Sequence, residues 1–188
     1  MAVYTDISDA ELEAFLGAYD LGAPLSFKGV AEGVENSNFL LETEKGRYFL
    51  TIYERRVRRE DLPFFLGFMQ HLARRGFPSA TPIEDRGGAL LGEIRGKPAA
   101  IVSFLSGLSV RRPTPAHCRE AGMGLAWLHE AGDGFGGHRD NDLGHPAWPA
   151  MFERLRAAAD ALKPGLADLI AGDVAQLADG WPAGCPRA

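Results

Sequence analysis

The spacing of hydrophobic residues changes along the chain, and each change predicts a different kind of secondary structure. Residues 8–22 carry apolar side chains at helical spacing, behind a Ser-x-x-Glu pattern at Ser8 and Glu11 that is typical of a helix N-terminus. Apolar and polar residues then alternate, which predicts three strands, at 25–30, 38–43 and 47–54. A short connection that ends at Gly46 separates the last two strands, so we expect them to form a hairpin.

A helical period returns at residues 61–75, where Pro63 falls in the first turn and Gly76 follows the last apolar position. Two further strands are predicted at 89–94 and 98–105, and the second is apolar enough to lie inside a sheet. This part of the pattern therefore predicts a five-stranded sheet with one helix inserted after its third strand.

The pattern becomes helical after Gly107, with candidate helices at 114–130, 147–162 and 165–177. We place a boundary near residues 106–113, which divides the chain into residues 1–106 and residues 107–188. The sequence thus predicts an α+β fold in which an antiparallel sheet precedes a helical region.

Composition narrows the range of partners. With 46% hydrophobic and 24% charged residues the chain is an ordinary globular protein, and its net charge of -5 disfavours a nucleic-acid partner. No apolar run approaches the roughly 20 residues that span a bilayer, and the N-terminus lacks the regions of a signal peptide. We therefore expect a cytoplasmic protein with no membrane partner.

Cys118 and Cys185 lie too far apart to suggest a disulfide framework or a zinc site, and no oligomeric state is indicated.

Three local sequences add a family resemblance. They are Gly-Val-Glu-Asn-Ser-Asn-Phe-Leu-Leu at 33–41, Gly-Arg-Tyr-Phe-Leu-Thr-Ile-Tyr-Glu at 46–54 and Leu-Ala-Trp-Leu-His at 125–129. Together they resemble the bacterial homoserine kinases of the aminoglycoside phosphotransferase superfamily, whose fold is protein-kinase-like. The resemblance implies that residues 1–106 form an ATP-binding N-terminal lobe and residues 107–188 form the hinge and an incomplete helical C-terminal lobe.

The resemblance also implies an activity. Members of that family transfer the γ-phosphoryl group of ATP to the side-chain hydroxyl of L-homoserine, a step of threonine biosynthesis. It therefore implies ATP and Mg²⁺ as cofactors and L-homoserine as a small-molecule substrate. Two alternatives stay open: a phosphotransferase that acts on another small alcohol, and a non-catalytic nucleotide-binding module.

The phosphate-facing turn of such a lobe would lie between the first two strands. From spacing alone a polar hairpin loop is the better interpretation, because the segment matches neither G-x-G-x-x-G nor a P-loop. The resemblance reverses this preference, since glycine permits close backbone approach and Asn and Ser side chains can donate hydrogen bonds to phosphate oxygens. The candidates that it implies are Gly29, Gly33, Asn36, Ser37 and Asn38.

The remaining candidates lie on the third and fifth strands. Thr51 occupies the position where many kinase-like proteins carry a lysine that contacts the nucleotide phosphates, so no such cation is predicted here. Glu60 and Asp61 are candidates for an acidic ion-pair partner, although charges at a helix entry have the same pattern. The segment Ser103, Phe104 and Leu105 resembles the hinge, whose backbone would contact the adenine ring.

The catalytic loop of the family, His-x-Asp-x-x-x-x-Asn, does not occur in the chain, and neither does the Asp-containing motif that binds magnesium. In the family, the segment that resembles residues 181–187 leads directly into that loop. We therefore expect no catalytic residue and no metal ligand within these residues, with the magnesium ligands beyond Ala188. The chain by itself should then have negligible activity, because phosphoryl transfer depends on both groups.

Overall fold

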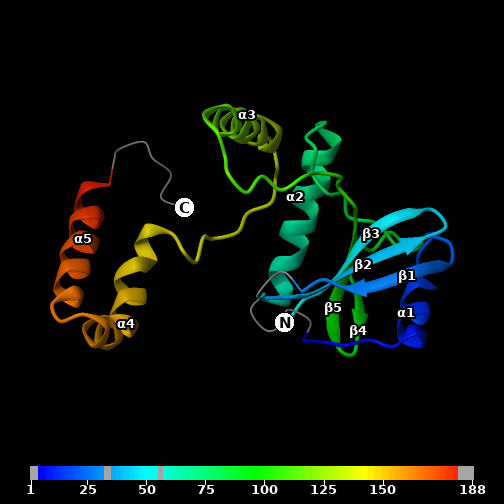
Figure 1. Cartoon of the computed structure of the whole chain (residues 1–188), viewed down its shortest axis with the longest axis horizontal. Helices are drawn as coiled ribbons and strands as arrows, with labels where there is room; N and C mark the ends of the chain where they lie inside the picture. Colours follow the sequence, from blue (N-terminus) through cyan, green and yellow to red (C-terminus); the bar gives the residue numbers. More distant parts are fainter. Residues whose placement is uncertain (1–3, 32–34, 55–56, 182–188) are drawn as a thin grey trace. The chain divides into compact units, whose positions relative to one another are not determined.

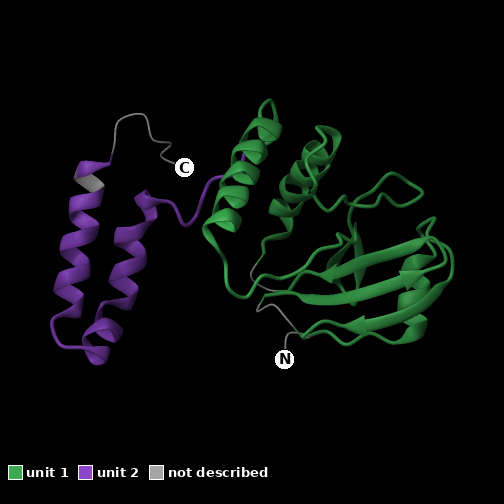
Figure 2. Cartoon of the chain, turned by 45° about the horizontal axis from the view of Figure 1, so that its top comes forward, with its two compact units in different colours: residues 1–137 green, residues 138–188 purple. Residues whose placement is uncertain are grey.

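The structure, a computed structural model, describes residues 4–31, 35–54 and 57–181 (Figure 1). It forms two compact units, Met1–Gly137 and His138–Ala188 (Figure 2). The first unit contains α1 (Asp9–Leu16), β1 (Pro24–Gly29), β2 (Ser37–Thr43), β3 (Gly46–Ile52), η1 (Arg59–Asp61), α2 (Leu62–Arg74), β4 (Gly92–Ile94), β5 (Lys97–Ser103) and α3 (Pro115–Gly132). The second unit contains η2 (His145–Ala147), α4 (Trp148–Leu162) and α5 (Leu166–Gly180).

The five strands form one antiparallel sheet in the order β1-β2-β3-β5-β4. This confirms the predicted α+β fold, with α2 inserted between the third and fourth strands. The β4–β5 hairpin turns through Arg95 and Gly96, whose φ values of 51° and 75° are both positive, as a type I′ turn requires. β3 lies between β2 and β5, so its residues have a cross-strand neighbour on each side.

Glu11 joins α1 to the β4–β5 hairpin. Its carboxylate completes a capping box with Ser8 and accepts a hydrogen bond from Arg95 Nε at 2.6 Å. The hydrogen bond from Arg95, followed by those from Ser8, lowers the pKa of Glu11 to about 2. One residue therefore both starts the helix and fixes it against the turn of the sheet.

The sheet has two different faces, because successive side chains of a strand point to opposite sides. One face packs against α1 and the segments on either side of it, and forms the main hydrophobic core. Its buried strand residues are Phe39, Leu41, Leu50, Ile52, Ile94, Ala99 and Ile101, and the residues that cover them are Ile7, Leu12, Leu16, Tyr19 and Leu21. The opposite face carries Asn38, Leu40, Phe49, Thr51 and Val102, which are all half-buried.

The fourth strand begins later than the sequence predicts. It covers Gly92–Ile94 rather than residues 89–94, because Asp85 holds the preceding segment in a turn. The Oδ1 atom of Asp85 accepts hydrogen bonds from the backbone N–H groups of Gly87 and Ala89, both at 2.8 Å. A side chain thus satisfies backbone groups that the pattern assigned to a strand.

Aromatic rings join α2 to the end of α3. The ring of Phe135, just after α3, lies 5.5 Å from Phe64 and 5.1 Å from Phe68, measured between centroids. Arg75, after α2, donates a hydrogen bond to the backbone oxygen of Asp133 at 2.7 Å. α3 therefore belongs to the same compact unit as the sheet. The division at residue 106 refers to the lobes of a kinase-like fold and stays a prediction.

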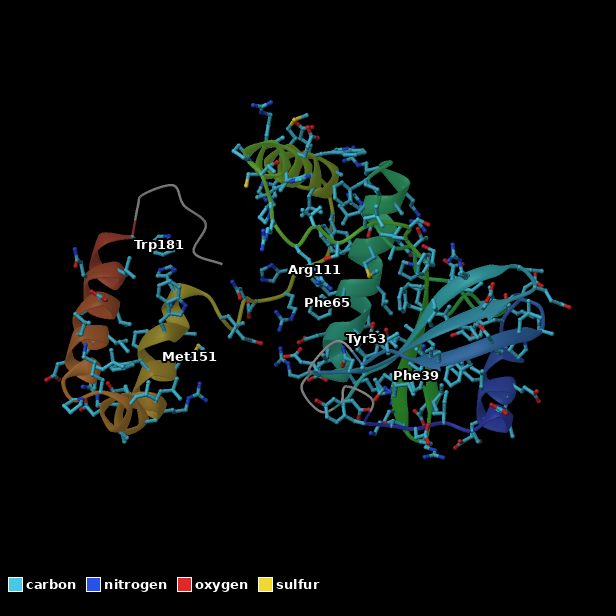
Figure 3. The ribbon with its side chains drawn as sticks, viewed as in Figure 1. Phe39, Tyr53, Phe65, Arg111, Met151 and Trp181 are labelled. Atoms are coloured by element: carbon cyan, nitrogen blue, oxygen red, sulfur yellow. The ribbon has the colours of Figure 1, made fainter. Side chains whose placement is uncertain are left out.

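The second unit is a pair of helices with an open apolar groove of about 450 Å³ between them. The groove is lined by Met151 and Phe152 of α4 and by Ile170 of α5, among other apolar residues. Trp181, which follows α5 and is labelled in Figure 3, stacks on the ring of His145 with 4.0 Å between centroids. In the described part of the chain, none of the helices is both long enough and apolar enough to span a membrane.

Truncation of a central core residue should cost far more stability than truncation of an edge residue. Leu50 is fully buried between Phe39 and Ile101 across the strands, whereas Leu25 on β1 is 64% exposed. We expect Leu50→Ala to lower the free energy of unfolding by about 3 kcal/mol and Leu25→Ala by less than about 1 kcal/mol. Urea unfolding followed by circular dichroism measures both values, and equal losses would contradict this placement of the core.

Candidate nucleotide-binding site

Two predicted site residues meet on the sheet face opposite α1. Asn38 and Thr51 are directly opposite each other in the β2–β3 register, and Thr51 Oγ1 donates a hydrogen bond to Asn38 Oδ1 at 2.9 Å. Ala100 of β5 is the neighbour of Thr51 on its other side. These three residues form a cross-strand row that we call the polar layer.

An apolar row lies next to the polar layer. It consists of Leu40, Phe49 and Val102, which are paired across the same three strands and are half-buried. The two rows are two residues apart along each strand, or about 7 Å. We call this row the apolar layer; it lies between the polar layer and the end of β5.

The segment predicted as the hinge begins at Ser103, the last residue of β5. Ser103 is held to Thr81 by two hydrogen bonds, both of 2.9 Å: Ser103 N donates to Thr81 O, and Thr81 N donates to Ser103 Oγ. Phe104 N donates to the backbone oxygen of Arg47 at 3.2 Å, and its ring stacks on Phe49 with 5.6 Å between centroids. Leu105 is 49% exposed. The structure therefore joins the predicted hinge to the apolar layer, and contact with adenine stays a prediction.

Ser37 lies on the other face of the sheet, in a buried hydrogen-bond network. Its hydroxyl accepts hydrogen bonds from the backbone N–H groups of Tyr4 and Thr5, at 2.8 and 2.9 Å, and donates to Glu54 Oε1 at 2.8 Å. Lys97 forms an ion pair with Glu54 and donates to Thr5 Oγ1 at 2.7 Å. We call Thr5, Ser37, Glu54 and Lys97 the anchoring network, because it fixes the N-terminal segment to the sheet.

The anchoring network shows that Lys97 does not replace the missing lysine of the third strand. Lys97 lies on the same side of the sheet as Ala99 and Ile101, which belong to the core, whereas Thr51 lies on the opposite side. Ser37 has one O–H group, and this group donates a hydrogen bond to Glu54. The structure therefore places Ser37 in the anchoring network. Its predicted contact with phosphate stays a prediction.

The charge of Glu54 is stabilised by its partners. Burial acts to raise the pKa of this carboxyl group, but hydrogen bonds from Lys97, Thr5 and Ser37 outweigh burial, and the net pKa is below its ordinary value. The Glu54 side chain is 10% exposed and that of Lys97 is 37% exposed. The pair is therefore better shielded from water than the surface ion pairs of this protein.

The other candidates of the phosphate-facing turn lie around its two ends. Asn36 Oδ1 accepts a hydrogen bond from Glu54 N at 3.3 Å, and Gly29 ends β1 opposite Phe39. Gly33 lies outside the described residues. Asn36 thus lies beside the residues that follow β3, whereas Gly29 pairs with β2.

The two acidic candidates, Glu60 and Asp61, lie in η1, immediately before α2. Asp61 pairs with Arg58 at 3.1 Å within the turn that leads into α2, and Glu60 is exposed.

His138-Arg139-Asp140 matches the first three residues of the kinase catalytic loop, but a histidine occupies position 145, where the pattern needs asparagine. No group of three or more His, Cys, Asp or Glu side chains that could hold a metal ion occurs among the described residues.

A comparison with protein families now decides the class of the chain. The family model of the phosphotransferase enzyme family matches residues 26–188, which is most of the sequence. The chain belongs to this phosphotransferase family.

Relatives of this phosphotransferase chain carry a narrower name. A protein from Phenylobacterium zucineum is 69% identical over 187 residues, and one from Caulobacter vibrioides is 68% identical over 186 residues. Both are named homoserine kinase. The match covers 100% and 99% of this chain but only 58% and 59% of those proteins, so the chain spans about three fifths of their length.

Solved structures of phosphotransferases show the same fold. An aminoglycoside phosphotransferase from Alicyclobacillus acidocaldarius superimposes with a TM-score of 0.60 at 18% identity, over 95% of this chain and 55% of that protein. A spectinomycin phosphotransferase in complex with ADP and spectinomycin gives a TM-score of 0.54 at 14% identity, over 84% of this chain and 56% of that protein. These matches confirm the predicted protein-kinase-like fold.

Sequence reasoning missed two features of this phosphotransferase chain. The apolar layer had a usable signal, because the alternation of β2 and β3 places Leu40 and Phe49 on the same face as Thr51. The anchoring network had none, since Glu54 and Lys97 are 43 positions apart and meet only through strand pairing.

Loss of Lys97 should destabilise the protein more than loss of a more exposed lysine. Lys97→Met leaves the Glu54 carboxylate without its cation, and we expect a loss of about 1 to 2 kcal/mol after allowance for the partial exposure of Lys97. Lys45→Met removes an ion pair with Asp20 whose side chains are 49% and 78% exposed, and should lower the free energy of unfolding much less. Urea unfolding at pH 7 measures both, and a larger loss for Lys45→Met would refute the anchoring role.

The contribution of Glu54 should depend on pH. Because its pKa in the folded protein lies below its ordinary value of 4.5, the stabilisation is present above that value and is lost as the pH falls through the folded pKa. We therefore expect wild type to be more stable than Glu54→Gln at pH 7 and this difference to shrink below about pH 4.5. A difference in unfolding free energy that stays constant from pH 7 to pH 3 would show that Glu54 is not stabilised as a carboxylate.

Proposed function

We propose that this chain is the nucleotide-binding portion of a homoserine kinase, which transfers the γ-phosphoryl group of ATP to the hydroxyl group of L-homoserine. The observation that carries the proposal is 69% identity, over 187 residues, to a protein of that name. Membership of the phosphotransferase family supports the reaction class. We place the protein in the cytoplasm, with L-homoserine as its small-molecule substrate and the product entering threonine biosynthesis.

The sheet face opposite α1 suits an adenine nucleotide. The apolar layer of Leu40, Phe49 and Val102, next to the hinge segment, offers a half-buried surface on which a base can pack. The polar layer follows at about 7 Å along the strands and offers hydrogen-bonding groups to the phosphates. We infer that the base lies toward Phe104 and the phosphates lie toward Asn38 and Thr51.

Magnesium has no comparable site in the described residues. The described His, Cys, Asp and Glu side chains do not form a group of three that could hold a metal ion, so the chain does not fit this cofactor in the part that the structure describes. We therefore assign magnesium no ligand here. The role that we propose for the chain is to bind and orient the nucleotide.

Nucleotide binding by the 188-residue chain is the direct test of this role. We expect saturable binding of ATP and ADP by isothermal titration calorimetry, and no production of O-phosphohomoserine when ATP, Mg²⁺ and L-homoserine are supplied. Failure to bind either nucleotide would overturn the proposed function. Turnover of homoserine by the chain alone would contradict the division of roles that we propose.

A chimera tests the substrate. The matched N-terminal portion of the Caulobacter vibrioides homoserine kinase is replaced by this chain, and ATP-dependent phosphorylation is measured with L-homoserine, choline and an aminoglycoside. We expect homoserine to be phosphorylated within about tenfold of the parent rate, which corresponds to at most about 1.4 kcal/mol in transition-state stabilisation. A chimera that is folded and binds ATP, but is inactive on homoserine, would favour a non-catalytic nucleotide-binding module.

A further inference from the structure

The hydrogen bond between Thr51 and Asn38 determines how the asparagine amide is turned. Thr51 Oγ1 donates its only proton to Asn38 Oδ1 at 2.9 Å. The Oδ1 and Nδ2 atoms of a carboxamide lie on opposite sides of the group, so Nδ2 and its two N–H donors point away from the threonine hydroxyl. One hydroxyl group therefore selects which side of Asn38 is the donor side.

The surroundings of the pair restrict it to this arrangement. The two residues are directly opposite each other on β2 and β3, and both are half-buried. Thr51 is β-branched, so its χ1 angle is confined to few rotamers in a strand. Its other neighbour, Ala100, has a methyl side chain that cannot compete for the hydrogen bond. The orientation of the Asn38 amide is thus held by a hydrogen bond from a stiff residue.

We propose that Thr51 is a positioning residue, which turns the Asn38 carboxamide so that Nδ2 donates a hydrogen bond to the phosphate chain of the bound nucleotide. This inference rests on the proposed function, because it requires the phosphates to lie at the polar layer. In this arrangement the phosphates accept a hydrogen bond from the neutral amide of Asn38, which the Thr51 hydroxyl orients. Many other kinase-like proteins use a lysine of the third strand for this contact. The acceptor is charged, which strengthens such a hydrogen bond relative to one between two neutral groups.

Neither Lys97 nor Asn36 duplicates this arrangement. Lys97 lies on the other face of the sheet and is paired with Glu54. Asn36 also has its Oδ1 atom engaged, but by the backbone N–H of Glu54 at 3.3 Å, a contact that no side-chain substitution at position 54 removes. The Thr51–Asn38 pair is therefore the place where removal of one hydroxyl group tests the orientation of an amide.

The experiment compares two substitutions at position 51. Thr51→Val keeps the shape and β-branching of the side chain but removes the hydroxyl, and Thr51→Ser keeps the hydroxyl. Dissociation constants for ATP and for adenosine are measured with the 188-residue chain by competition against a fluorescent adenine nucleotide. We expect Thr51→Val to weaken ATP binding about five- to tenfold, the size of one hydrogen bond, and to change adenosine binding less than about twofold. Thr51→Ser should restore ATP binding to within about threefold of wild type.

A double-mutant cycle tests whether Thr51 acts through Asn38. Asn38→Ala should weaken ATP binding at least as much as Thr51→Val, because it removes the donor itself. When both residues are changed, the loss should equal that of Asn38→Ala alone, since the hydroxyl then has no amide to orient. Thr51→Ala removes the same hydroxyl with a smaller side chain, and it takes the place of Thr51→Val if the valine variant does not show the cooperative unfolding of wild type.

The outcomes separate this inference from the function on which it rests. If the wild-type chain binds neither ATP nor adenosine, the proposed function fails. If ATP binds but Thr51→Val weakens ATP and adenosine equally, Thr51 shapes the sheet rather than a phosphate contact, and the inference is overturned. It is also overturned if Thr51→Ser does not restore binding, or if the losses from Asn38→Ala and Thr51→Val add.

Discussion

The central position of β3 is the constraint on which the core and the candidate site both depend. This strand is hydrogen-bonded to β2 on one side and to β5 on the other. Its side chains therefore alternate between the core face of the sheet and the opposite face. Leu50 and Ile52 enter the core beneath α1, so Phe49 and Thr51 are directed to the opposite face. A shift of one residue in the register would exchange the two sets, exposing leucine and burying threonine, and the packing of the core therefore also fixes the site.

The same alternation places the Glu54–Lys97 ion pair and the polar layer on opposite faces of the sheet. Glu54 and Lys97 lie on the core side, where they bind the N-terminal segment through Thr5 and Ser37. Thr51 and Asn38 lie on the other side, and both are neutral. A cation can attract phosphate from several directions, whereas an amide must be turned correctly to donate. The phosphate contact proposed for Asn38 therefore needs a second residue that sets the orientation of its amide.

Fold and substrate rest on different observations in this protein. The fold is shared with phosphotransferases that are only 18% and 14% identical to the chain, so it does not define what is phosphorylated. The assignment to homoserine depends on relatives of 69% and 68% identity, over about three fifths of their length. The face proposed to bind nucleotide lies in the part that is compared in both cases, which is why nucleotide binding is the property that this chain can test by itself.

Local pattern was enough to predict the elements, because each one depends on residues close in sequence. The capping box at Ser8 and Glu11, the proline in the first turn of α2 and the alternation of the strands all report the environment of single residues. The short connection at residues 44–46 predicts the β2–β3 hairpin, but the register that places Asn38 opposite Thr51 is known only from the structure. The tertiary structure decided which distant groups meet: Lys97 with Glu54, and Phe135 with α2. Periodicity describes the face that a residue occupies, but a pair of side chains separated by many residues forms only when strand register and helix packing bring the two together.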